Sequence, residues 1–164
     1  MLTLLLLAAS LTQPVAEDIP ACVRATIDRV ATDCEYIDTL RLGSGASLLK
    51  WRIAHPPDSN RALSDGARVS REVIGVHLID CITAEGAAQY LAARLAEVGK
   101  DAGVLALGDE AALRQRGGDD SRTVIDFRVA QYTVSVTAPN GTPARLFAQA
   151  TAAALRTTPN CVRQ

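Results

Sequence analysis

Residues 123–138, TVIDFRVAQYTVSVTA, decide the fold class of this chain. Two runs within the stretch, Thr123 to Val129 and Tyr132 to Ala138, are rich in β-branched and aromatic residues. Apolar and polar residues alternate along both runs, as in strands with one buried face. Only Ala130 and Gln131 separate them, which suits a two-residue connection. The stretch therefore predicts a β-hairpin.

A second hairpin is predicted earlier in the chain, from Tyr36 to Leu42 and from Leu48 to Ala54, with glycines in the connection between them. In its second strand apolar residues alternate with basic ones, and Trp51 belongs to the apolar set, so we expect Trp51 in the core. The connection, Gly43-Ser44-Gly45, lacks the third glycine and the Lys-Ser/Thr pair of a phosphate-binding loop. We therefore interpret it as a hairpin loop.

One strand is predicted between the two hairpins, from Val73 to Ile82. It is apolar on both alternating faces except at His77 and Asp80, as expected of a strand in the middle of a sheet.

Three helices are predicted around these strands. Pro20 suits a first helical position, and apolar residues recur at helical spacing from there to Cys34. Thr83 can cap a helix from Ala84 to Val98. A third helix, capped by Thr142 and opened by Pro143, is expected to run to about Leu155, with Leu146, Phe147 and Ala150 on its core side.

The segment before the last hairpin gives a weaker pattern. A short apolar piece from Val104 to Leu107 is followed by Gly108, Asp109 and Glu110, and then by an Ala-rich segment in which we expect a small turn of helix. The order of all these elements predicts an α+β fold. Its antiparallel sheet is built from two hairpins and a central strand, and it packs against N-terminal, middle and C-terminal helices.

The first residues predict export. Leu2 to Leu11 form an almost unbroken apolar run that ends at the polar stretch before Pro14, as in a signal peptide, although no Lys or Arg precedes the run. A run of about ten residues is too short to span a membrane, which takes roughly 20. We expect cleavage after Ala16, or alternatively after Ser10. Residues 1–16 are then the signal peptide, and residues 17–164 form one periplasmic or secreted domain.

Four cysteines lie after the expected cleavage site, Cys22, Cys34, Cys81 and Cys161. An even number of cysteines in an exported chain is typical of a disulfide framework, so two bridges are predicted. A continuous helix from residue 22 to residue 34 would span about 18 Å, too far for a bridge between the two ends. Two pairings then stay open, Cys22 with Cys161 and Cys34 with Cys81, or Cys22 with Cys81 and Cys34 with Cys161. We favour the first.

Composition excludes some classes of function. There are 17 Lys and Arg against 18 Asp and Glu, a net charge of −1, so the basic face of a nucleic-acid binder is not expected. The cysteines and the two histidines lack the spacing of metal ligands, and no metal or other cofactor is predicted. His77 and Cys81 would lie about 13 Å apart along a strand, so no catalytic residues are predicted there.

Two polar loops hold the candidate ligand-binding residues, 55–71 and 114–122, because loops supply contacts while rigid elements position them. The candidates are the polar side chains that packing does not use: His55, Asp58, Arg61, Arg68, Arg116, Asp119 and Arg122.

The last third of the chain resembles a known group of proteins. Gly108-Asp109-Glu110-Ala111, the hairpin of residues 124–136 and an Ala-rich closing helix are similar to the end of small exported bacterial α+β domains, some with the PsbP-like fold. The resemblance implies an antiparallel sheet with flanking helices and a binding or accessory role, and it carries no catalytic positions.

The function expected from the sequence is therefore a non-enzymatic binding or accessory domain with an unknown protein or small-molecule partner. A structural envelope-associated protein is one alternative. The other is a small hydrolase-type enzyme whose site is built from residues distant in sequence.

Overall fold

A computed structural model describes residues 18–43, 45–54, 72–98, 103–104, 106–116 and 122–161 of the chain. Three helices and seven strands follow one another in this part. In chain order they are α1 (Ile19–Val30), β1 (Cys34–Arg41), β2 (Ala46–Ile53), β3 (Val73–Asp80), α3 (Ala84–Val98), β4 (Gly103–Val104), β5 (Glu110–Arg116), β6 (Arg122–Val129), β7 (Tyr132–Ala138) and α4 (Gly141–Cys161).

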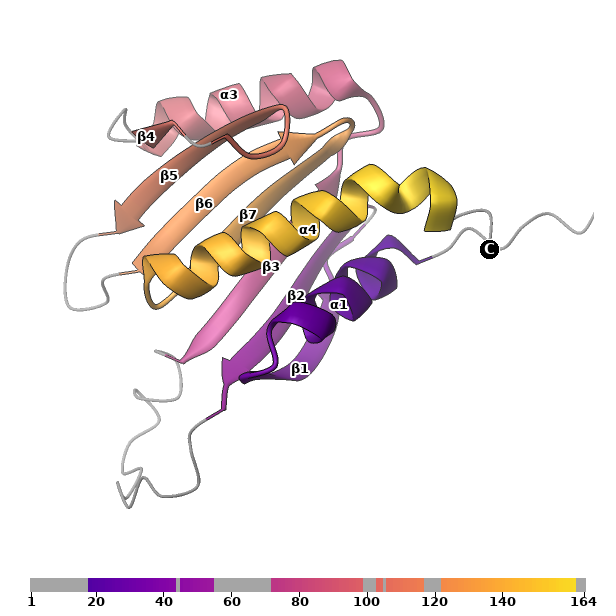
Figure 1. Cartoon of the computed structure of the whole chain (residues 1–164). Coiled ribbons are helices and arrows are strands. Elements are labelled where there is room, and N and C mark those ends of the chain that lie inside the picture. The colour runs from indigo at the N-terminus through magenta and orange to yellow at the C-terminus, as the bar shows by residue number, and fades with distance from the viewer. Residues whose placement is uncertain are drawn as a thin grey trace, which may run out of the picture.

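The strands form one antiparallel sheet in the order β1-β2-β3-β7-β6-β5-β4. α1 and α4 pack side by side on one face, and α3 lies on the other face over β6 and β7 (Figure 1). The predicted α+β fold is confirmed, with helices on both faces of the sheet. β3 pairs with β2 on one side and with β7 on the other, so it joins the two hairpins as predicted.

The main core lies between the sheet and the pair α1 and α4. Trp51 is fully buried there, as expected. Its ring meets those of Tyr36 and Phe147 edge to face, with centroids 5.6 and 5.2 Å away. Its indole N–H donates to Asp28 Oδ1 at 2.8 Å, so the one polar atom of the ring is satisfied.

The first helix is shorter than the sequence predicted. α1 ends at Val30, where the N–H of Ala31 still bonds to Ile27 O, and the N–H of Cys34 bonds to Ala31 O in a tight turn. Cys34 is therefore the first residue of β1 and pairs with Ile53. Helical spacing alone did not separate the end of the helix from the strand after it.

The Ala-rich segment after Gly108 is a strand, not the predicted turn of helix. Residues 110–116 form β5, paired along their whole length with β6. Their intrinsic preference for helix is overridden because β6 offers an open edge of backbone hydrogen bonds. The last helix also differs from the prediction. It continues past Leu155 to Cys161, and Phe147 and Ala150 are buried whereas Leu146 is exposed.

The predicted bridges among Cys22, Cys34 and Cys81 are absent, because in the described part of the chain no two cysteines lie at bridging distance. Cys34 opens β1 beside the end of β2, whereas Cys81 follows β3 at the other end of the sheet. A strand of eight residues, about 26 Å long, separates these two ends. The side chain of Cys161 lies outside the described residues, so the predicted bridges to Cys161 stay predictions.

Candidate ligand-binding cavity

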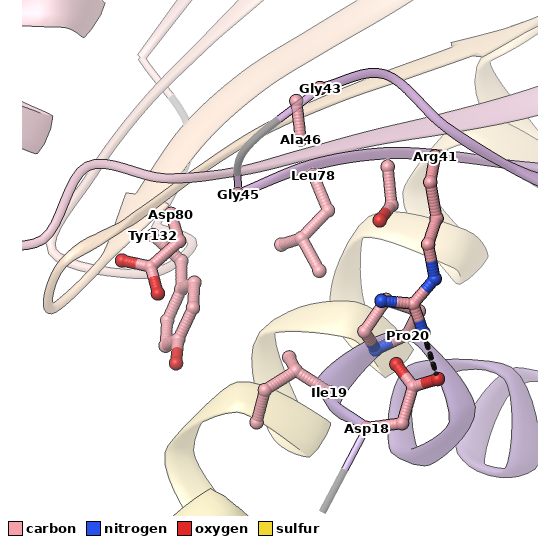
Figure 2. A pocket seen from close by; sticks show the side chains of 11 residues that line it. Asp18, Ile19, Pro20, Arg41, Gly43, Gly45, Ala46, Leu78, Asp80 and Tyr132 are labelled. Atoms are coloured by element: carbon pink, nitrogen blue, oxygen red, sulfur yellow. Dashed lines mark hydrogen bonds and ion pairs between the residues drawn. The ribbon is translucent and has the colours of Figure 1, made fainter. Parts of the chain in front are cut away.

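A cavity of about 290 Å³ opens where the β1–β2 hairpin, the end of β3 and the start of β7 meet the first turn of α1 (Figure 2). Its volume is at the small end of the range for ligand pockets, which suits a ligand of metabolite size. The lining comes from α1 and the residue before it, the β1–β2 hairpin, β3 and β7: Asp18, Ile19, Pro20, Arg41, Gly43, Gly45, Ala46, Ser47, Leu78, Asp80 and Tyr132.

Small residues in the hairpin leave this space open. Residues 43, 45, 46 and 47 on its walls are glycine, alanine and serine. Gly45 adopts φ +78°, and its carbonyl accepts a hydrogen bond from Asp80 N at 2.8 Å. A Cβ at this position would lie 3.2 Å from the backbone oxygen of Asp80. Glycine therefore allows the hairpin backbone to lie close to β3, and it puts no side chain into the cavity.

Ser47 is the most informative residue of the lining. It lies on β2 between Arg41 of β1 and Leu78 of β3, and only 8% of its surface is exposed. Its hydroxyl has no hydrogen-bond partner among the described residues, although it can both donate and accept. The described residues leave this hydroxyl free to donate and accept, so it can bind another molecule in the cavity.

Asp80 and Tyr132 face each other across the pairing of β3 with β7. Their side chains lie next to one another at the cavity (Figure 2). Burial raises the pKa of the Tyr132 phenol, and the Asp80 carboxylate raises it further, so Tyr132 is a neutral hydrogen-bond donor and acceptor at neutral pH.

The cavity wall opposite Asp80 and Tyr132 consists of an ion pair and apolar side chains. Asp18, just before α1, binds Arg41 at 2.5 Å between Oδ2 and a guanidinium nitrogen (Figure 2). Ile19 and Leu78 supply the apolar surface between this pair and the Asp80 side. The cavity thus offers hydroxyls, a carboxylate and an apolar floor.

A buried charge cluster lies on the opposite face of the sheet and holds α3 in place. The Asp126 carboxylate is fully buried between Arg94 Nε at 3.0 Å and the guanidinium of Arg114, and Arg94 also donates to Ser135 Oγ at 3.3 Å. The space beside these groups is closed, so the cluster joins α3 to β5, β6 and β7 and does not form a ligand site.

His77 lies on the α3 face of the sheet and Asp80 on the α1 face, so the two side chains do not meet. Burial lowers the pKa of His77, and the nearby Arg94 guanidinium lowers it further. Among the described residues, no group of three or more His, Cys, Asp or Glu side chains is placed to hold a metal ion. No helix of the described ranges is long and apolar enough to cross a membrane.

Most of the predicted loop candidates lie outside the described residues, namely His55, Asp58, Arg61, Arg68 and Asp119. Arg116 ends β5, and its side chain also lies outside them. Arg122 opens β6, and its guanidinium donates to the backbone oxygen of Val73 at the start of β3. Arg122 therefore links the start of β6 to the start of β3. Both predicted loops are attached at this end of the sheet, which lies opposite the cavity.

The cavity residues were not predicted as a site. The sequence places Ser47 in the connection of the first hairpin and Asp80 and Tyr132 in predicted strands, and it assigns none of them to a ligand site. Two features of the sequence could have indicated these residues. One is the run of small residues in the first hairpin, and the other is the Asp80 carboxylate at the end of a strand that is otherwise apolar except at His77. The pairing of β3 with β7, which brings Asp80 to Tyr132, is a long-range contact that sequence periodicity does not specify.

Comparison of the chain with models of protein families, with curated proteins and with solved structures found no match. The resemblance to the PsbP-like fold therefore stays a prediction from residues 108–155.

Proposed function

We propose that this chain is an exported binding domain that holds a small molecule in the cavity beneath the β1–β2 hairpin. The apolar run before residue 12 supports export to the periplasm or outside the cell. The single observation that carries the binding site is Ser47, a residue that is 8% exposed and lines the cavity, and whose hydroxyl has no hydrogen-bond partner within the described residues.

The geometry fits a compact ligand with an apolar body and one or two polar groups. Ile19 and Leu78 take the apolar part, while Ser47 and Tyr132 offer hydroxyls that can donate or accept. Ligand sites combine mostly apolar walls with a few placed polar groups in this way.

Benzyl alcohol is a suitable probe because it carries one ring and one hydroxyl. We expect it to shift the backbone amide resonances of Ser47, Leu78 and Tyr132 in a saturable titration. Ser47→Ala should weaken the binding, with the free energy of unfolding unchanged or slightly raised, because the variant removes a hydroxyl that makes no hydrogen bond within the described residues.

Ser135 provides the matched control. It is also 8% exposed, but its hydroxyl accepts a hydrogen bond from Arg94 on the far face of the sheet. Ser135→Ala should lower stability and leave benzyl alcohol binding intact. If wild-type protein shows no saturable shift at these amides, or if Ser47→Ala binds as well as wild type, the cavity is not the site proposed.

A further inference from the structure

The charges around the cavity do not cancel. Asp18 and Arg41 neutralise one another at the mouth, with 2.5 Å between them. Asp80 has no such partner, since none of the basic side chains that the structure describes forms an ion pair with it. Within the described residues, one carboxylate of the lining is therefore left without a compensating positive charge.

Neutral donors already hold one oxygen of this carboxylate. Asp80 Oδ1 accepts from the backbone N–H of Ile82 at 2.8 Å and from Gln131 Nε2 at 3.1 Å. The first of these bonds fixes the turn after β3, where Ile82 adopts φ +67°. No hydrogen bond within the described residues uses Oδ2, which is left to accept from a ligand.

The groups beside Asp80 suit a ligand that donates hydrogen bonds. The Tyr132 ring forms the adjacent wall, and an aromatic face attracts a cation. The guanidinium in the cavity lining, that of Arg41, is bound to Asp18 on the other side of the cavity. The Ser47 hydroxyl, which has no hydrogen-bond partner among the described residues, lines the same cavity, so the argument for a ligand does not depend on the carboxylate alone.

We propose that the cavity selects a small organic cation, an amine with an apolar body, whose ammonium group binds Asp80 Oδ2 while its apolar part packs on Leu78 and Ile19. The inference depends on the proposed function, because it assigns a ligand class to the same cavity. An ammonium group replaces the missing counter-charge, and a hydrogen bond between charged groups is about twice as strong as a neutral one.

The test compares three probes of the same shape that differ in charge: benzylamine, benzyl alcohol and benzoate. Dissociation constants come from the amide shifts of Ser47, Leu78 and Tyr132 at pH 7 and low salt. Wild-type protein should bind benzylamine at least about tenfold more tightly than benzyl alcohol, and benzoate more weakly than either.

Asp80→Asn should abolish this preference, because the amide oxygen can still accept from Ile82 and Gln131 but carries no charge. Asp109→Asn is the control. Its carboxylate accepts from the N–H of Ala130 at 2.8 Å in the β6–β7 turn and lies outside the lining. The control variant should bind all three probes like wild type.

Equal binding of benzylamine and benzyl alcohol by wild-type protein would overturn the assignment to a cation and leave the proposed function standing. Preference for benzoate, or an amine preference that persists in Asp80→Asn, would overturn it as well. Absence of binding by all three probes would overturn both the cation assignment and the proposed function.

Discussion

Asp126 is the residue whose charge the fold most depends on. Its fully buried carboxylate faces two guanidinium groups, of which Arg114 is only 14% exposed. Asp126→Asn keeps the shape but leaves these cations without a counter-charge, so we expect a loss of about 3–5 kcal/mol in the free energy of unfolding, measured with urea. Glu35→Gln, in an exposed pair with Arg52, should cost at most about 1 kcal/mol. Similar losses in both variants would contradict this role.

Protonation of His77 should make the stability of the protein fall as the pH falls. Burial and the Arg94 guanidinium hold its folded-state pKa below the ordinary value of 6.5. The unfolded chain therefore binds the proton first as pH falls, and stability should decrease below about pH 6.5. His77→Gln should reduce the difference between urea midpoints measured at pH 7.5 and pH 5. An unchanged difference would assign the acid response to other groups.

At the scale of elements, the close pairing of β5 with β6 depends on one glycine, Gly108. Gly108 adopts φ +65°, and a Cβ there would lie 2.3 Å from the backbone oxygen of Arg128 on β6. Gly108→Ala should therefore push β5 away from β6 and lower stability by more than about 1 kcal/mol in thermal or urea unfolding. Gly141→Ala is the control, because a Cβ at the start of α4 meets nothing within 4 Å. If Gly108→Ala is as stable as Gly141→Ala, the close approach to Arg128 does not constrain β5.

The elements that the sequence predicted well are those with strong periodicity. The two hairpins contain strands with alternating apolar residues, the strand from residue 73 is an apolar run of strand length, and α3 begins and ends at the predicted residues. β5 was missed because EAALRQR favours a helix and becomes a strand only beside β6. The cavity was missed for a related reason, since its walls meet through pairings between elements distant in sequence.

At the scale of the whole molecule, the cysteines give a direct test of the fold. Cys34 and Cys81 lie near opposite ends of the sheet. We therefore expect no Cys34–Cys81 disulfide in protein purified from an oxidising compartment. Alkylation of the denatured, unreduced chain followed by peptide mass mapping should find both as alkylated thiols. In the folded protein Cys34 should react slowly, because burial, followed by the Asp33 charge, raises its pKa. A Cys34–Cys81 peptide would contradict this arrangement of the strands.

The sheet also separates the two candidate binding surfaces. The cavity lies where β3 ends and β7 begins, whereas residues 55–71 connect strands at the other end. There Ile53 N donates to Glu72 O at 3.1 Å, so the ends of this connection are already adjacent and a short Gly-Ser linker can join them. Replacing residues 55–71 in this way should leave the melting temperature nearly unchanged and leave benzylamine binding at the wild-type value, as measured by thermal unfolding and by the amide titration. Loss of benzylamine binding with an intact melting transition would instead place the ligand at the predicted loop residues, His55, Asp58, Arg61 and Arg68, because those side chains are the ones that the replacement removes.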